Sequence, residues 1–501
     1  MHRSARGRVR APRWRGRGWW GAGERGPELD ELRGRVVLLD FWTGGCVNCT
    51  HAAGELRALE ERFGADLVVL GVRTPKFPHE ATPAALRAAA GRLDLRHPVL
   101  DDADRATWDA YAVKAWPTVV LLAPDGYVED RWSGEGHGAE IGERVAEVLD
   151  RHRADGSWRT GPDLFVPEPR VTKSFRFPAR LGAAADGGVL VADAGNSRVV
   201  ELDADLVTER WSSTASALVE PRGFCFLPTA VAREVGHDLV VADAGGHALF
   251  GRRSDGYLHR IAGTGEPLRR REGGGPAAQQ TMSTPEDVAW FDGQVVVAMA
   301  GVHQLWALDP LAGHLRVIAG TTAEGLRDGS AEAAWFAQPT GLAPDPVGDR
   351  LWFVDAETSA LRWLRRRPGV TPDRSIPGVV DPRFANVDPV ARPGYEVHTV
   401  VGQGLFEFGH LDGPAAEALM QHPHGLTVAP DGSVLVADTY NGAVRRVRPD
   451  GEVSTIARDL AEPTDVLVQG DTLVVVESAG HRLTRVPLEG EDCADLCRPR
   501  F

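Results

Sequence analysis

The sequence predicts two domains in succession, an α/β domain with a central sheet and an all-β propeller of about six blades. The chain has 501 residues, which is too long for one ordinary hydrophobic core. Its first third alternates apolar, strand-like runs with amphipathic helical segments, whereas its last two thirds repeat one strand–turn–strand pattern. The 57 glycines and 34 prolines supply the many turns that an all-β region needs.

Changes in composition divide the chain into five segments. We expect a basic extension at residues 1–28, the α/β domain at 29–153, a linker at 154–170, the propeller at 171–488 and a C-terminal tail at 489–501. The first segment is rich in arginine, and we interpret it as a solvated extension. An arm for nucleic acid or an anionic surface is the alternative.

The totals exclude several classes of partner. A net charge of -14 disfavours nucleic acid as a partner of the body of the protein. The sequence has no run of 18 apolar residues and no apolar segment after the N-terminal arginines, so we expect no membrane insertion and a cytoplasmic protein. Five cysteines in so long a chain do not make a disulfide framework, and in a reducing compartment a lone CxxC motif indicates catalysis or metal binding instead.

A CxxC motif stands at a predicted junction between a strand and a helix. The apolar run 36–42 is typical of a buried parallel strand, and residues 51–63 have apolar positions at helical spacing. Cys46 therefore faces the unpaired N–H groups at a helix N-terminus, which stabilise its thiolate and lower its pKa. Cys49 lies one turn further along, where it can attack a mixed disulfide formed at Cys46.

The α/β alternation continues beyond the motif. We expect a second buried strand at 67–72, an amphipathic helix near 83–93 and a short strand at 97–100. The stretch KAWPTVVLLAPDG follows, in which Trp116 and Pro117 precede a strand and then a turn.

This arrangement resembles the thioredoxin superfamily and, within it, the NHL-repeat-containing thioredoxin-like proteins. The resemblance covers about residues 36–149, and the stretches TPKFPHE and SGEGH are also similar to that family. It implies that Asp40 lies beneath the thiol pair and exchanges a proton with Cys49. It also implies that Pro117 is cis, which places the backbone of Trp116 beside the disulfide, where it can pair with an extended substrate.

Lys76 and Glu80 are candidate supporting residues that approach the site from an adjoining loop, with a solvated surface as the alternative. The chain departs from the family at two places. Gly44-Gly45 stands where a further cysteine usually precedes the first active one, and Val47-Asn48 stands where typical thioredoxins have Gly-Pro. Because such positions tune the reduction potential, the direction of electron transfer stays open.

The CxxC motif has three other interpretations. Zinc needs two more ligands beside the CxxC pair. The other cysteines, Cys225, Cys493 and Cys497, are distant and lack a standard spacing to histidine, so we expect no metal and no cofactor. A thiol peroxidase of the redoxin type is an alternative, since residues 43–46 supply T-x-x-C, although Leu39 replaces the proline of that motif. The other alternative is a non-catalytic interaction scaffold with a vestigial redox domain.

The last two thirds of the chain contain six segments that align without gaps, such as VLVADAGNSRVVEL and VLVADTYNGAVRRV. Their spacing, mostly about 40 to 55 residues, matches four-stranded propeller blades and resembles the NHL repeat over about residues 171–488. Met299 replaces an acid that the other five segments share (Asp193, Asp243, Asp355, Asp438 and Glu477). We expect these acids to accept backbone N–H bonds in Asx turns, a structural role.

The sequence thus predicts a thiol–disulfide oxidoreductase in which Cys46 attacks, Cys49 resolves and Asp40 assists. Its expected partners are a disulfide-containing protein substrate, an unidentified electron donor and a protein bound on a loop face of the propeller. For Cys493 and Cys497 in the tail, a relay with Cys46 is the alternative to incidental thiols.

Overall fold

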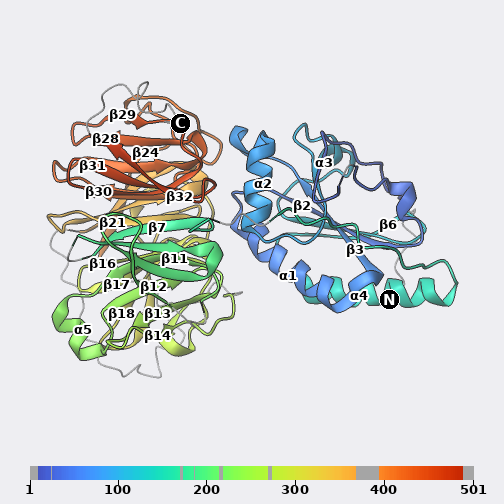
Figure 1. Cartoon of the computed structure of the whole chain (residues 1–501), viewed down its shortest axis with the longest axis horizontal. Helices are drawn as coiled ribbons and strands as arrows, with labels where there is room; N and C mark the ends of the chain where they lie inside the picture. The colour runs from blue at the N-terminus through green and yellow to red at the C-terminus, as the bar shows by residue number, and fades with distance from the viewer. Residues whose placement is uncertain are drawn as a thin grey trace. The chain divides into compact units, whose positions relative to one another are not determined.

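The computed structural model describes residues 9–23, 25–169, 173–184, 187–213, 218–268, 273–367 and 394–488. The chain forms two compact units, Met1–Val171 and Thr172–Phe501. The first is an α/β unit and the second a β-propeller, so the predicted fold is confirmed (Figure 1). The predicted tail with Cys493 and Cys497 lies outside the described residues.

The first unit is built on one six-stranded sheet. Its order is β1 (Trp19–Trp20), β4 (Val99–Asp101), β3 (Leu67–Arg73), β2 (Val36–Trp42), β5 (Thr118–Leu122) and β6 (Val128–Ser133). The three central strands β2, β3 and β4 run parallel, and β5 pairs antiparallel with β2. Every residue of β2 and β3 is buried, as expected for parallel strands that are covered on both faces.

Helices cover both faces of this sheet (Figure 1). The α-helices are α1 (Val47–Phe63), α2 (Pro83–Arg92), α3 (Ala106–Ala110) and α4 (Gly138–Ala154), and the 3-10 helices are η1 (Leu29–Leu32), η2 (Gly64–Asp66) and η3 (Pro78–Ala81). Val36 and Leu38 of β2 pack with α1 and α4, whereas Val37 and Leu39 pack with α3 on the opposite face. The period of two along β2 thus assigns Asp40 to the face that α1 covers.

The described part of the predicted extension belongs to the first unit. β1 pairs antiparallel with β4, and both Trp14 and Trp20 are buried. The indole N–H of Trp14 donates to the carbonyl of Pro27 at 2.9 Å. Two large apolar side chains gain more by packing than by staying in water, which explains why this segment is anchored to the sheet at Trp14 and Trp20 although its arginines are solvated.

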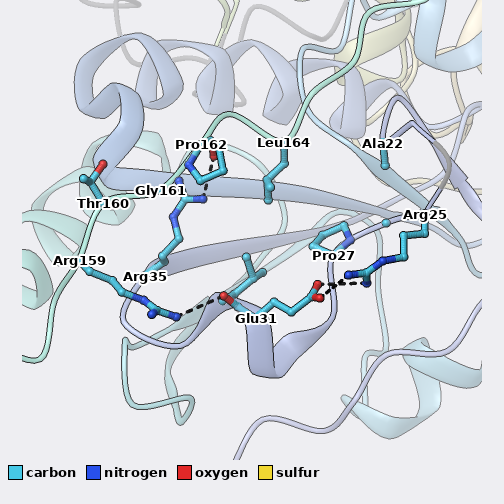
Figure 2. Close-up of a pocket in the computed structure, with 12 residues that line it drawn as sticks. Ala22, Arg25, Pro27, Glu31, Arg35, Arg159, Thr160, Gly161, Pro162 and Leu164 are labelled. Carbon is cyan, nitrogen blue, oxygen red and sulfur yellow. Dashed lines mark hydrogen bonds and ion pairs between the residues drawn. The ribbon is translucent and has the colours of Figure 1, made fainter.

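The predicted linker also lies along the first unit as far as Val166. Its backbone N–H groups at Arg159 and Val166 donate to the carbonyls of Gly34 and Gly21, both at 2.8 Å. Figure 2 shows the buried guanidinium of Arg35 reaching the carbonyl of Pro162, at 3.0 Å. A cavity of about 440 Å³ lies between these linker residues and the segment 22–35. Hydrogen bonds to backbone carbonyls therefore hold the linker in place.

The second unit has six blades, each built around antiparallel strands. Blade 1 is β7 (Pro178–Ala183), β8 (Val189–Asp193), β9 (Arg198–Leu202) and β10 (Glu209–Ser212). Blade 2 is β11 (Pro221–Phe226), β12 (Leu239–Asp243), β13 (Ala248–Arg252) and β14 (Leu258–Ala262), with the helix α5 (Thr229–Val235) between β11 and β12. Blade 3 is β16 (Pro285–Phe291), β17 (Gln294–Met299), β18 (Gln304–Asp309) and β19 (His314–Ala319), joined at its edge by β15 (Gly274–Pro276).

The remaining blades follow the same plan. Blade 4 is β21 (Pro339–Pro344), β22 (Arg350–Asp355), β23 (Ala360–Arg366) and β24 (Tyr395–Val401), with β20 (Gly329–Ser330) at its edge. Blade 5 is β26 (Gly425–Val428), β27 (Val434–Asp438), β28 (Ala443–Val447) and β29 (Glu452–Ala457), with β25 (Gly413–Pro414). Blade 6 is β30 (Pro463–Gln469), β31 (Thr472–Glu477) and β32 (Arg482–Pro487) among the described residues, and β30 contacts β7 to close the ring.

The recurring acids have a structural role, but their partners differ from the expectation. Asp355 accepts the backbone N–H of Ala337 at 2.8 Å, and Asp438 accepts that of Gln421 at 2.7 Å. In all five acidic blades one backbone donor lies 16 to 24 residues earlier, in the segment that enters the blade. These acids thus tie the blade's entry to the end of its second strand, and Asp243 also accepts the local N–H of Gly246, three residues further on.

Candidate active site

The two cysteines of the CxxC motif lie at the start of α1. Cys46 is the N-cap residue with an extended backbone, and its carbonyl accepts the N–H of Cys49 at 3.1 Å. Both residues are free thiols in this structure. Cys46 is partly exposed, whereas Cys49 is only 2% exposed. A disulfide partner can therefore approach Cys46 more easily than Cys49.

The two thiols also differ in acidity. A hydrogen bond from the Cys49 thiol lowers the pKa of Cys46, and backbone N–H groups and the charge of Lys76 act in the same direction. Burial raises the pKa of Cys49 well above its usual value, and donating to Cys46 adds to that effect. Since the thiolate is the nucleophile in disulfide exchange, Cys46 is poised to attack and Cys49 needs a proton acceptor.

Asp40 lies on β2 and is 2% exposed. Burial raises the pKa of its carboxyl to about 7, while the charge of His97 lowers it and that of Glu60 raises it. Its Oδ1 atom is buried and has no hydrogen-bond partner among the described residues. The charge of Asp40 raises the pKa of Cys49, so the carboxyl lies within electrostatic reach of that thiol.

Trp116 and Pro117 lie directly before β5. The peptide bond between them is cis, as the resemblance implies. The Trp116 side chain packs against the apolar cluster that contains Cys49 and that Cys46 also contacts. The centroids of the Trp108 and Trp116 rings lie 4.5 Å apart. The structure thus brings Trp116 to the same cluster as both thiols.

Glu80 is buried and ties together two loops beside Cys46. Its carboxylate accepts the hydroxyl of Thr43 at 2.7 Å and the N–H groups of Gly44 and Gly45 at 2.6 and 3.1 Å. It also accepts the N–H groups of Lys76 and Phe77, at 2.8 and 3.0 Å. The alternative of a solvated Glu80 is therefore wrong, because five donors converge on a buried carboxylate and set the path of the chain into Cys46.

Several polar contacts around α1 were not predicted from the sequence. The ring of His97 pairs through Nδ1 with the Glu60 carboxylate at 3.0 Å. The N–H of Gly138 donates to Glu55 at 2.9 Å, and the ring of His51 pairs with Glu135. The similarity of SGEGH to the family was the one available signal for the last two contacts, and no local signal marked His97.

The described residues contain no group of three or more His, Cys, Asp or Glu side chains that could hold a metal ion. Cys225 lies on β11 of the propeller, where burial raises the pKa of its thiol far above the usual value. Within the part of the chain that the structure describes, no helix is long and apolar enough to cross a membrane.

Comparisons with known proteins bear on both units. A thioredoxin-like family model matches residues 34–128, and an NHL repeat model matches 420–446. The chain is 30% identical over 447 residues to SUPPRESSOR OF QUENCHING 1, chloroplastic, of Arabidopsis thaliana, which covers 84% of this chain and 39% of that protein. It is 29% identical over 459 residues to NHL repeat-containing protein 2 of Gallus gallus, covering 84% of this chain and 59% of that protein.

A third relative matches the first unit alone. Thiol-disulfide oxidoreductase YkuV of Bacillus subtilis is 24% identical over 115 residues, covering 23% of this chain and 78% of that protein. The predicted resemblance to thioredoxin-like, NHL-repeat proteins is thus confirmed. This chain nevertheless spans only 39% to 59% of the length of the first two relatives.

Proposed function

Because this chain joins a thioredoxin-like domain to an NHL-repeat propeller, we propose that it is a thiol–disulfide oxidoreductase with Cys46 and Cys49 as its working pair. The observation that supports this proposal is the asymmetry of the two thiols. Cys46 is partly exposed and has a lowered pKa, whereas Cys49 is buried, has a raised pKa and lies within reach of the Asp40 carboxyl. The YkuV relative, a thiol-disulfide oxidoreductase by name, points to the same chemistry.

The reaction proceeds in two exchanges. The Cys46 thiolate attacks one sulfur of a substrate disulfide, forms a mixed disulfide and releases the other sulfur as a thiolate, which takes a proton from water. Cys49 then gives its proton to the Asp40 carboxylate and attacks the Cys46 sulfur. The second substrate sulfur leaves as a thiolate that water protonates. Two electrons have passed to the substrate, and the enzyme holds a Cys46–Cys49 disulfide.

Binding of the substrate and partner forms part of the same proposal. An extended segment of the substrate pairs with the backbone at Trp116, beside the cis bond to Pro117. The propeller binds a protein partner that brings the substrate or the electron donor, and we retain the cytoplasm as the expected compartment. Thr43, which the thiol peroxidase alternative requires, donates its hydroxyl to Glu80, so we do not extend the proposal to peroxide.

Replacing each cysteine separately tests this proposal. In the full chain, Cys46→Ser should reduce the turnover of a peptide disulfide to the uncatalysed background. Cys49→Ser should instead accumulate a mixed disulfide on Cys46, which intact-mass spectrometry detects. Cys225→Ser is the matched control, because that thiol lies on β11 of the propeller, has a raised pKa and should not affect turnover. Full activity in Cys46→Ser would refute the proposal and favour a non-catalytic scaffold.

A further inference from the structure

Three buried polar atoms around Asp40 lack a hydrogen-bond partner among the described residues. They are Oδ1 of Asp40, Nε1 of Trp42 and Nε2 of His97. Asp40 and Trp42 lie on the same face of β2, and Asp40 is in register with Gly71 of β3, which pairs in turn with Val99 of β4. A Cβ atom at Gly71 would lie 3.0 Å from both the Trp42 indole nitrogen and Val99. Buried polar atoms are rarely left unpaired, so such a group calls for an explanation.

His97 connects this group to the surface. Its Nδ1 atom lies 3.0 Å from Oε1 of Glu60, and a carboxylate accepts, so Nδ1 carries a proton, and in the neutral ring Nε2 then offers a lone pair. The His97 side chain is 4% exposed, whereas that of Glu60 on α1 is 23% exposed. The polar groups thus lead from a buried carboxyl at Asp40 to a partly solvated one at Glu60.

Among the described residues, few titratable groups face Asp40. The groups that act on or respond to Asp40 are Cys49 and Glu60 from α1 and His97 from the segment before β4. Both β3 and β5 place an uncharged residue in register with Asp40. Among these groups, His97 is the one that leads away from the thiols, through its contact with Glu60.

We propose that His97 and Glu60 form a proton path between Asp40 and solvent. The inference rests on the proposed function, which it deepens. After Asp40 has taken the Cys49 proton, it passes a proton to Nε2 of His97, directly or across one bridging water. Nδ1 of His97 gives its proton to the Glu60 carboxylate, which releases it to solvent. The ring then carries its proton on Nε2 instead of Nδ1.

Reduction of the enzyme by its dithiol donor reverses each transfer. The Cys49 thiolate that forms when the donor opens the disulfide takes a proton from Asp40. Asp40 regains a proton from Nε2 of His97, and Nδ1 receives one from Glu60, which solvent has protonated. The tautomer of His97 is restored, so one full cycle leaves the path unchanged.

The test compares the two thiol steps in His97→Gln and Glu60→Gln. Mixed-disulfide formation is measured in the Cys49→Ser background, and resolution by stopped-flow in the background that keeps Cys49. Both variants should slow resolution roughly tenfold at pH 7 and leave mixed-disulfide formation unchanged. The pKa of Asp40, followed by carboxyl NMR, should rise in His97→Gln and fall in Glu60→Gln, since the two charges act on it in opposite directions.

Glu61→Gln is the matched control, because Glu61 is the next residue on α1 and its side chain is 68% exposed. It should change neither step. If His97→Gln fails to fold, Glu60→Gln on the helix surface still decides the question. Wild-type resolution rates across pH 5–9 in both variants would overturn the proton path. An active Cys46→Ser variant would instead overturn the proposed function itself.

Discussion

Asp40 in the first unit and Asp438 in the propeller are both completely buried acids near the end of a β-strand. Burial raises the pKa of both, to about 7 for Asp40 and about 6 for Asp438, so acidity alone does not distinguish them. Their partners do. Asp438 binds the N–H of Gln421 at 2.7 Å and the guanidinium of Arg445 at 2.8 Å, whereas Oδ1 of Asp40 has no partner among the described residues.

This difference separates a structural acid from a reactive one. A buried carboxylate that is fully hydrogen-bonded fixes its surroundings, while an unpartnered one beside a thiol can gain and lose a proton. The propeller repeats the structural arrangement, because Arg362 joins Asp355 and Asp328 as Arg445 joins Asp438 and Asp412. In blade 3 the buried residues Met299 and Trp306 occupy the equivalent positions, so an apolar pair can replace the ionic one.

Removing one partner of the ionic pair should have the largest effect on stability. We expect Arg445→Met to lower the free energy of unfolding of the propeller by about 3–5 kcal/mol, because Asp438 would stay buried without its cation. Urea-dependent hydrogen exchange of the full chain, measured on peptides from β27, checks this value. Turnover at the thiol pair should not change.

Arg446→Met is the control for that experiment. Arg446 pairs with the half-exposed Asp431, and such surface pairs contribute about 1 kcal/mol or less. Equal losses of unfolding free energy in Arg445→Met and Arg446→Met would show that the buried pair with Asp438 stabilises the propeller no more than a surface pair does. Asp438 could then no longer serve as the structural acid with which Asp40 is contrasted.

Replacing Asp40, the acid without a hydrogen-bond partner at Oδ1, should raise stability instead of lowering it. The folded state keeps the Asp40 proton up to about pH 7, whereas the unfolded chain loses it near pH 4, so the stability of the first unit falls as pH rises between these values. Asp40→Asn stays neutral and should lack this fall. The difference in the free energy of unfolding between Asp40→Asn and the wild type should be more favourable to the variant at pH 8 than at pH 4, by up to about 4 kcal/mol.

Hydrogen exchange of β2 peptides, with urea as the denaturant at both pH values, measures this difference. In disulfide exchange the same variant should lose about 10²-fold in the rate of resolution at pH 7, the low end for a positioned acid–base group. A variant that is less stable at pH 8 than the wild type would mean that Asp40 has a stabilising partner, which would contradict its assignment as the reactive acid.

The smallest effect should come from Lys76. Its charge helps to lower the pKa of Cys46, and its backbone N–H to Glu80 survives substitution. We expect Lys76→Met to raise the pKa of Cys46 and reduce its thiolate fraction at pH 7 a few-fold, as measured by the pH dependence of iodoacetamide alkylation. Lys114→Met is the control, because Lys114 is an exposed lysine of the same unit, in the segment before Trp116. An equal shift in both variants would refute a specific role for Lys76.

Local patterns explain what could be predicted from the sequence. The apolar run 36–42, the CxxC motif and the helical spacing after it lie within 28 residues, so they reveal the strand, the thiol pair and the helix together. The blades were predictable for the same reason, since each motif is one strand, a turn and a second strand.

Contacts between distant residues could not be predicted in this way. Glu80 accepts from Thr43 and Gly44, and Glu60 meets His97, each pair 36 or 37 residues apart. The arginines near the N-terminus suggested a solvated arm, although Trp14 supplies an apolar side chain that the sheet buries. Composition reports the average of a segment, whereas burial depends on where single side chains pack.

The reduction potential of the Cys46–Cys49 pair tests the central claim most directly. The full chain is equilibrated in glutathione or dithiothreitol buffers, and free thiols are trapped and counted by mass spectrometry. We predict a reversible two-electron couple between roughly -270 and -120 mV that disappears in Cys49→Ser. If both thiols stay free, or oxidise without a reversible midpoint, the pair is not a working redox couple and the thioredoxin-like unit serves as a scaffold.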